Sequence, residues 1–557
     1  MSDFAQFSLL YPDASPAFKS NPNPHLFADL NLRRLVRSIA LSPQYETYVS
    51  NILTTLTQDV EVIRYRQAII NDLLNNPTLV EQLHSVLEEI LALEGYLTQP
   101  QWKENVLRQV AWRLSELQRY VDTIDKLTHV LSNTNDSLQS DGLKRLSEML
   151  EHVVADETFQ HLKTELPTLL PKIRHIRSVT VGINLDLDMR PLSATLLDTH
   201  HEPFINETMV TRLLGIGKKE GIKSPNPTHN ARYVAGLQDF QIELNDRKSP
   251  LMPPLFRDLS ELMDDTSRPI VRALKKYTQI HSQMLVSLKM DIAFYLGVVQ
   301  AIQRVREANL PMTQPDILAV EAREMHIEGM YNINLLFQQL NKTKDKTEII
   351  GNDVHFGTDG RIFILTGPNQ GGKTTYTTAV GLVQVMAQAG LPVPATDARV
   401  SPVDAIYTHF AKEERPNLEA GRLGEEARRL NEIFESASQH SLVLLNESLA
   451  STSATESLFL ARDVVRAFRL LGVRAIFATH LHDLAADSDN MNAETAGDSR
   501  IISVVSQVQT IDDNGKVKRT YQIIPAPPNS KSYAIELAAR FGISFEQLKK
   551  TIQRDDV

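Results

Sequence analysis

Apolar residues recur at intervals of three and four from about residue 28 to 340, as in the stretch VEQLHSVLEEILALEGYL, and glycine is sparse there. This spacing places apolar side chains along one face of a helix, so it predicts a helical region. Two stretches interrupt the pattern. They are PLSATLLDTHHEPF at about 191–204 and GIGKKEGIKSPNPTH at 215–229, and the second is rich in glycine, proline and lysine, as loops are.

A very long helical pattern follows the second interruption and runs from about Pro269 to Ala308. Pro269 suits a first helical turn, and only Gly297 weakens the interior. A run of about 40 residues exceeds the usual length of a globular helix, so it predicts a coiled-coil-like arm or lever within residues 205–310. A single long core helix is the alternative.

The pattern changes at about residue 350, where short apolar strands alternate with helical stretches. The strands are RIFILTG, ARVSPV, SLVLLNE and RAIFATH, and they predict a mostly parallel α/β sheet. After residue 500, RIISVVSQVQTI and KVKRTYQIIPA predict a hairpin, and SYAIELAARFG and SFEQLKKTIQRD predict closing helices. We therefore predict an α+α/β fold, with a helical core and lever or clamp arms over residues 1–340 and an α/β domain over 341–557.

Composition narrows the class of protein. A chain of 557 residues is expected to form two or three structural units, and its net charge of −10 gives no global attraction for nucleic acid. The absence of cysteine excludes disulfides, thiolate zinc sites and cysteine nucleophiles, and it fits a reducing compartment. The N-terminal stretch MSDFAQFSLLYPD has no basic leader, and the apolar stretch Met284–Ile302 contains Lys289 and Asp291, which makes it too polar for a membrane span. These features predict a cytoplasmic protein without a membrane partner.

A phosphate-binding loop follows the strand RIFILT. The residues GPNQGGKT at 367–374 fit G-x-x-x-x-G-K-[ST] and are followed by a helical pattern, which is the context that this loop requires. Glycines let backbone amides turn toward phosphates, Lys373 would neutralise the β- and γ-phosphates, and the Thr374 hydroxyl would ligate Mg²⁺. The predicted ATP-binding residues are Gly367, Pro368, Asn369, Gln370, Gly371, Gly372, Lys373, Thr374 and Thr375.

Two later strands end in candidate catalytic residues. The strand SLVLLNES ends in Asn446 and Glu447, where P-loop NTPases have an Asp that binds the Mg²⁺ water shell and, in their ABC-like branch, a Glu that orients or deprotonates the attacking water. An Asn carbonyl still accepts a hydrogen bond from a metal-bound water but adds no negative charge, so we expect weaker metal binding and slower hydrolysis. Within the stretch IFATHLHDL, the apolar strand ends at Thr479 and His480, and we predict that His480 contacts the γ-phosphate.

Several segments together resemble one family. GPNQGGKTTY is similar to the GPNxGGKST loop of the MutS-family ATPases, SLVLLNESLASTS resembles their LVLxDExxxGTS segment, and IFATHLHDL resembles their FATHxxEL. PNSKSYAIELAARFGI is similar to their KSYGIxVAxLAGxP, so the resemblance covers about residues 345–545, and DVEVIRYRQAIINDLL at 59–74 resembles their core and lever region more loosely. The resemblance implies an ABC-type ATPase that completes two nucleotide sites across a homodimer, with levers and a clamp that bind DNA.

The chain also departs from the family pattern. Asn446 replaces the Asp, and the usual Gly-Arg-Gly after Glu447 is absent, although Thr452 and Ser453 remain. GRLGEE at 421–426 lacks the Ser-Thr that would reach the partner's γ-phosphate, although Glu426 and Arg429 fall where the helix of that loop begins. No Phe-x-Glu stands near the N-terminus, so we expect no direct mismatch reading by an inserted aromatic ring.

DNA contacts at the level of shape and backbone remain as an expectation. The candidates are lysines of the central loop and of the long helix, each of which could equally be a solvated surface lysine. They are Lys218, Lys219, Lys223, Lys275 and Lys276.

The resulting hypothesis is an ATP- and Mg²⁺-dependent, dimeric DNA-binding ATPase that closes its levers on duplex or branched DNA in repair or recombination. The alternative is a nucleotide-gated dimeric scaffold with negligible hydrolysis, which Asn446 and the missing Ser-Thr favour and which Glu447 and His480 oppose. An ABC transporter subunit is disfavoured, because the chain has no LSGGQ-like stretch and carries a large helical half.

Overall fold

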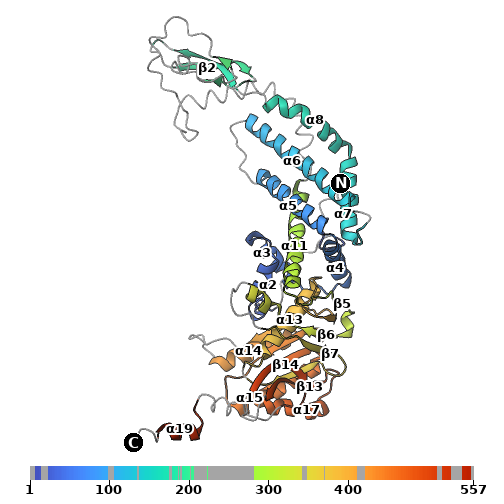
Figure 1. Cartoon of the computed structure of the whole chain (residues 1–557), viewed down its shortest axis with the longest axis vertical. Helices are drawn as coiled ribbons and strands as arrows, with labels where there is room; N and C mark the ends of the chain where they lie inside the picture. The colour runs from blue at the N-terminus through green and yellow to red at the C-terminus, as the bar shows by residue number, and fades with distance from the viewer. Residues whose placement is uncertain are drawn as a thin grey trace. The chain divides into compact units, whose positions relative to one another are not determined.

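The computed structural model describes residues 7–13, 23–97, 106–134, 137–174, 178–185, 187, 191–200, 202, 204–205, 222–223, 282–340, 348–368, 370–410, 421–510, 517–528 and 542–552. The chain divides into two compact units (Figure 1). The smaller unit comprises Met1–Ala5, Glu81–Asp136 and Arg145–Lys289, and the larger comprises Gln6–Val80, Ser137–Lys144 and Met290–Val557. The larger unit therefore takes in segments of both predicted domain ranges, 1–340 and 341–557.

Long helices make up most of the described part of the smaller unit. Buried residues recur at three and four along them, such as Leu83, Leu87 and Ile90 in one helix, which agrees with the helical pattern of the sequence. The elements of this unit are α6 (Val106–Ser132), α8 (Glu157–Arg174), β1 (Ser178–Leu185), β2 (Pro191–His200), β3 (Phe204–Ile205) and β4 (Ile222–Lys223), with parts of α5 (Pro77–Leu97), α7 (Asp141–Ala155) and α11 (Ser282–Glu307).

The prediction of helix is wrong at residues 178–185, which form strand β1. Strands β1 and β2 pair antiparallel there, with Ser178 opposite His200, and β2 occupies most of the interruption predicted at about 191–204. The stretch SVTVGINL is rich in β-branched residues, which pack well on a pleated strand. Their preference for a strand explains why this segment is not helical. Of the predicted long helix, α11 begins at Ser282, and residues 269–281 lie outside the described residues.

A six-stranded sheet forms the centre of the larger unit, in the order β10-β11-β12-β8-β13-β14. The first five strands are parallel to their neighbours, and β14 is antiparallel to β13, which agrees with the predicted parallel sheet and hairpin, although β10 was not among the predicted strands. The strands are β8 (Ile362–Thr366), β10 (Ile406–Phe410), β11 (Leu442–Asn446), β12 (Arg474–Ala478), β13 (Ile501–Thr510) and β14 (Val517–Pro525). The turn DDNG of the predicted hairpin and the segment SYAIELAARFG up to Phe541 lie outside the described residues.

Alternate residues of the central strands face opposite layers of helices. Val443 and Leu445 belong to a buried cluster with residues of α14 and α15, whereas Leu444 lies against Gly381 of α13. The sheet is therefore covered on both faces, which explains why its strands are continuous apolar runs. The helices of this unit include α1 (Leu26–Asp29), α2 (Leu32–Ile39), α3 (Glu46–Thr54), α4 (Val60–Asn75), α12 (Ile333–Leu340), α13 (Lys373–Gln388), α14 (Gly421–Ser436), α15 (Ala454–Leu471), α16 (His482–Ala486), α17 (Ser488–Glu494) and α19 (Phe545–Ile552).

A second, four-stranded sheet has the order β5-β9-β6-β7 and was not predicted. Its strands are β5 (Asp316–Ile317), β6 (Met325–Met330), β7 (Asn352–Phe356) and β9 (Asp397–Val400). The stretch ARVSPV thus forms a strand, but β9 pairs antiparallel with β6 in this mixed sheet and is not part of the parallel one. Short strands such as β5 carry too few residues for a period of two to be recognised.

The two charged residues in the apolar stretch Met284–Ile302 of α11, Lys289 and Asp291, are both buried and paired. The Asp291 carboxylate accepts hydrogen bonds from the Ser8 hydroxyl, the Leu9 N–H and the Tyr48 hydroxyl, while burial raises its pKa. Lys289 donates to Glu94 at 2.6 Å within the smaller unit. Among the described residues, no helix is long and apolar enough to cross a membrane.

Gly297 of α11 lies where the backbone at the end of α2 comes closest. A Cβ at this position would stand inside the contact distance of the Ile39 carbonyl oxygen. We predict that Gly297→Ala lowers the free energy of unfolding by about 2 kcal/mol, although alanine is the better helix former, because the backbone on both sides must move. Urea unfolding followed by circular dichroism measures the change. Gln300→Ala, at an exposed position of the same helix, is the control, and an equal effect of both changes would contradict the prediction.

Candidate nucleotide-binding site

The phosphate loop connects β8 to α13, and its shape depends on glycine. Gly367 and Gly372 have φ angles of +145° and +93°, which side chains rarely tolerate. A Cβ on Gly371 would lie 2.7 Å from Ser506 Oγ, and this hydroxyl donates to the Gly371 carbonyl at 2.6 Å. The loop therefore packs directly against β13, and its backbone is fixed in a turn that leads into the N-terminus of α13.

Lys373 is a buried cation whose hydrogen bonds go to carbonyl groups. Its side chain is 4% exposed, and Nζ donates to the carbonyls of Gly367 at 3.0 Å and Pro368 at 3.2 Å. Burial lowers the pKa of Lys373, and the nearby Glu447 carboxylate opposes this shift. A cation so placed at a helix N-terminus attracts an anion, and phosphate oxygens are the group that this arrangement fits.

Thr374 and Asn446 meet across the site. The Thr374 hydroxyl donates to Asn446 Oδ1 at 3.0 Å, and Asn446 is the last residue of β11 and 8% exposed. A hydroxyl and an amide oxygen are hard oxygen donors of the kind that Mg²⁺ accepts directly or through water. Within the described part of the chain, no group of three or more His, Cys, Asp and Glu side chains could bind a metal. Mg²⁺ usually keeps several waters and substrate phosphate oxygens among its ligands, so Thr374 and Asn446 would supply only part of its coordination.

Glu447 and His480 form the other half of the site. His480 Nε2 lies 3.0 Å from Glu447 Oε1, and the two side chains are 43% and 40% exposed. Glu447 has a φ angle of +54°, and its N–H donates to the Ala478 carbonyl at 2.8 Å, so its backbone is fixed against β12. A carboxylate that is partly open to solvent beside an imidazole can orient and deprotonate a water molecule.

Sheet order explains why these residues converge. β12 lies between β8 and β11 and is parallel to both. The segments that carry the site residues follow the carboxyl ends of these three strands. The phosphate loop, the Asn446–Glu447 pair and His480 therefore lie at one edge of the sheet. The structure brings together all predicted nucleotide-site residues except Asn369, which lies outside the described residues.

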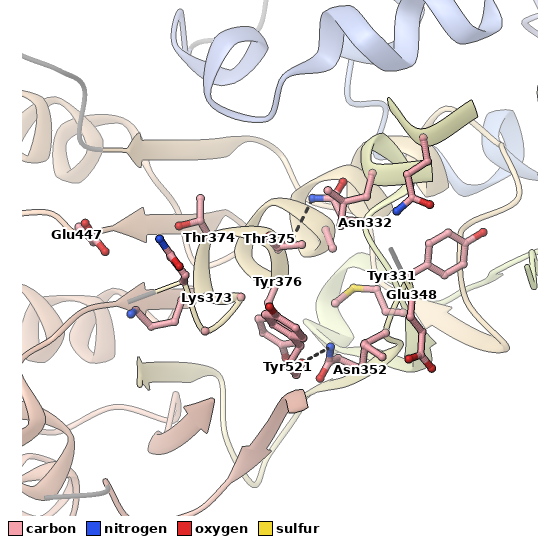
Figure 2. A pocket seen from close by; sticks show the side chains of 18 residues that line it. Tyr331, Asn332, Glu348, Asn352, Lys373, Thr374, Thr375, Tyr376, Glu447 and Tyr521 are labelled. Atoms are coloured by element: carbon pink, nitrogen blue, oxygen red, sulfur yellow. Dashed lines mark hydrogen bonds between the residues drawn. The ribbon is translucent and has the colours of Figure 1, made fainter. Parts of the chain in front are cut away.

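An adjoining pocket of about 420 Å³ was not predicted from the sequence. Residues of α13 and the phosphate loop line one part of it, and Tyr331, Asn332 and Tyr521 line another. In Figure 2, Lys373 and Glu447 lie at one side of the view and Tyr331 at the other, with the start of α13 between them. A mostly apolar cavity that continues from a phosphate loop fits the base and sugar of a nucleotide.

Tyr521 faces the phosphate loop because β14 is irregular at this point. Its φ angle is +57°, the register between β13 and β14 shifts beside it, and Asn352 bonds the strand on both sides (Figure 2). Asn352 Nδ2 donates to the Tyr521 carbonyl at 3.1 Å, and the Ile523 N–H donates to Asn352 Oδ1 at 2.7 Å. A bulge re-aims one side chain out of the strand alternation, and no local sequence signal marks it.

The remaining predicted site residues are mostly outside the described part of the chain. Lys218, Lys219, Lys275 and Lys276 lie outside it, and Lys223 ends β4 without a described side chain. The segment GRLGEE at 421–426 forms the start of α14. From this helix, Glu426 accepts a hydrogen bond from Ser451 at 3.2 Å and Arg429 lies 3.5 Å from Asp29.

Comparison with known proteins identifies two family domains. Residues 58–308 match the model of the MutS2 N-terminal domain, and residues 363–554 match the model of MutS domain V. The chain belongs to the MutS family. The phosphate loop, Asn446, Glu447 and His480 all fall within the domain V match, whereas Tyr331 and Asn352 precede it.

Curated relatives named Endonuclease MutS2 align with parts of the chain. The relative from Streptococcus uberis is 28% identical over 307 residues, which are 54% of this chain and 36% of the relative. The relative from Streptococcus equi subsp. equi is 31% identical over 202 residues, 36% of this chain and 24% of the relative. A relative from Streptococcus pneumoniae serotype 19F is 33% identical over 196 residues, 35% of this chain and 24% of the relative. The chain thus spans about a third or less of the length of these MutS2 relatives.

We predict that Tyr521→Ala weakens the binding of ATP by about tenfold, because the stacking of an aromatic ring on a base contributes about 1 kcal/mol or more. Tyr521→Phe preserves the ring and is expected to bind within about twofold of the native protein by the same argument. Titration with a fluorescent ATP analogue measures both dissociation constants. Equal affinity of the alanine variant and the native protein would show that Tyr521 does not contact the base.

Proposed function

We propose that the protein is an ABC-type ATPase that couples nucleotide binding and hydrolysis to the closure of helical levers on DNA. The observation that carries this proposal is the convergence of Lys373, the Thr374–Asn446 pair and the Glu447–His480 pair at the carboxyl ends of three neighbouring strands. Membership of the MutS family supports it.

Each residue has a defined role in this proposal. Lys373 and the loop amides bind the triphosphate, and the base enters the pocket beside Tyr521. Glu447 orients the attacking water and accepts its proton, while His480 fixes the Glu447 carboxylate and contacts the γ-phosphate. Thr374 and Asn446 would hold Mg²⁺, which would supply positive charge beside the phosphate oxygens.

Asn446 tunes the reaction in this proposal. Its Oδ1 already accepts a hydrogen bond from Thr374, as an Asp carboxylate would, so the geometry of the strand end is retained. The missing negative charge weakens the attraction for Mg²⁺, because a neutral amide interacts less strongly with a divalent cation than a carboxylate does. We propose that the protein hydrolyses ATP slowly but measurably.

The DNA and dimer parts of the proposal rest on the resemblance to the MutS family. A homodimer formed through the ATPase domains would complete each nucleotide site, and the levers would bind duplex or branched DNA in repair or recombination without reading a mismatch directly. Nucleotide can drive closure only if it binds the closed state more tightly than the open one. The second candidate function is a nucleotide-gated scaffold with negligible hydrolysis, and Asn446 is the observation that favours it.

Steady-state phosphate release from ATP separates the two functions. We predict that the native protein exceeds Glu447→Gln by at least about tenfold, because removal of a general base costs about 10²-fold or more for a competent enzyme. Asn446→Asp is expected to lower the Mg²⁺ concentration needed for half-maximal rate. If the native protein equals the Glu447→Gln baseline while Asn446→Asp turns over, the protein is a scaffold that has lost hydrolysis.

Salt dependence tests the DNA proposal. Each lysine that neutralises a phosphate releases counterions, so the combined change of Lys218, Lys219 and Lys223 to alanine is expected to reduce the slope of log affinity against log salt by about 2–3. Fluorescence anisotropy with duplex and branched DNA measures the slope. A control variant removes three lysines of the helices α6, α7 and α8, namely Lys126, Lys144 and Lys163. Binding of the native protein that is independent of salt would exclude phosphate contacts.

A further inference from the structure

A buried histidine lies behind the turn that carries Glu447. His409 of β10 is 1% exposed, and its Nδ1 lies 2.6 Å from the hydroxyl oxygen of Ser448, the residue that follows Glu447. The same Ser448 hydroxyl lies 3.1 Å from the His409 carbonyl oxygen, to which it donates. A neutral imidazole that carries its proton on Nδ1 satisfies both contacts, since Nδ1–H then donates to Ser448 Oγ.

The turn is strained, so contacts of this kind determine its shape. Glu447 and Leu449 have φ angles of +54° and +64°, in the left-handed region that residues other than glycine rarely adopt. Two such residues on either side of Ser448 cost about 1–3 kcal/mol each, and they persist only where the surroundings fix them. Leu449 is fixed by burial and by the Ser457 hydroxyl, which donates to its carbonyl at 2.6 Å. Ser448 is fixed by His409.

A histidine at this interior position lowers the stability of the fold, so its presence needs an explanation. Its Nε2 is buried and has no hydrogen-bond partner among the described residues. An unsatisfied buried polar atom destabilises the fold, and an apolar side chain of similar size would not carry this cost. Burial and the nearby Arg429 lower its pKa to about 4, so the ring is neutral near neutral pH. In the described part of the chain, the hydrogen bond of this ring is the one between Nδ1 and the Ser448 hydroxyl.

We propose that His409 and Ser448 form a positioning pair that aims the Glu447 carboxylate at the attacking water. The pair acts on the peptide that follows Glu447, while the Glu447 N–H bond to Ala478 fixes the peptide before it. With both peptides fixed, the Cα–Cβ direction of Glu447 is set, and the 3.0 Å contact with His480 places its carboxylate. This inference rests on the proposed hydrolysis, in which Glu447 orients the water.

Two replacements of His409 distinguish the two ring nitrogens. The side-chain amide of Asn places a hydrogen-bonding atom near the position of Nδ1, whereas that of Gln places it near Nε2. His409→Asn is therefore expected to retain the native rate within about threefold, and His409→Gln and Ser448→Ala to lower kcat by about tenfold. The dissociation constant for ATP is expected to stay within about twofold, because none of these residues lines the pocket. Combining His409→Gln with Ser448→Ala should cause no further loss, because the two residues act as one unit.

A second readout does not depend on turnover. The imidazole ¹⁵N signals of His480, recorded at one fixed pH, report its 3.0 Å contact with Glu447. Ser448→Ala and His409→Gln should shift these signals, and His409→Asn should leave them unchanged. Ser488→Ala is the control, because it removes another buried hydroxyl that donates to a carbonyl, at Ala485.

The outcomes separate this inference from the proposed function. If the native rate of phosphate release does not exceed that of Glu447→Gln, the proposed hydrolysis is contradicted. The His480 signals still test the positioning pair in that case. Native kcat and native His480 signals in folded Ser448→Ala would overturn the inference. If Ser448→Ala does not fold, the comparison of His409→Asn with His409→Gln decides. An equal effect of these two variants on kcat and on the His480 signals would also overturn the inference.

Discussion

The parallel pairing of β8, β12 and β11 is the constraint on which the rest of the site depends. In this register Leu365 pairs with Ala478, and Ala478 pairs with Asn446, so the three strands end level with one another. The segments that follow them then emerge side by side. Lysine, hydroxyl, amide, carboxylate and imidazole groups from distant parts of the sequence meet because the strand ends are level, and a shift of one strand by a single residue would turn its side chains to the opposite face.

The site concentrates unfavourable backbone conformations that neighbouring elements stabilise. Gln370, Glu447, Leu449 and Tyr521 all have positive φ angles, although none is glycine. Residues of this kind cluster at functional sites, where packing and hydrogen bonds over-determine the backbone. Here the stabilising contacts come from β12, β10 and β7, through Ala478, His409 and Asn352. The geometry around the nucleotide site is therefore a property of both sheets of the larger unit.

Much of this site could be predicted from the sequence, because its residues follow long apolar strands in a fixed order. The phosphate loop, Asn446, Glu447 and His480 were all recognisable in this way, and so were the parallel sheet and its terminal hairpin. Tyr521 and Asn352 were not, because a bulge has no local signature and a side-chain contact between distant strands has none either. The strands β1 and β2 were missed because the helical spacing around them dominated a short stretch with a period of two.

The central claim is that the ends of these three strands form one nucleotide site. A crystal structure of the protein with Mg²⁺ and a non-hydrolysable ATP analogue tests it most directly. The account predicts a triphosphate in contact with Lys373 and the loop amides, Mg²⁺ beside Thr374 and Asn446, the γ-phosphate facing Glu447 and His480, and the base against Tyr521. A nucleotide bound elsewhere, or a phosphate loop that remains empty at saturating analogue, would contradict the account.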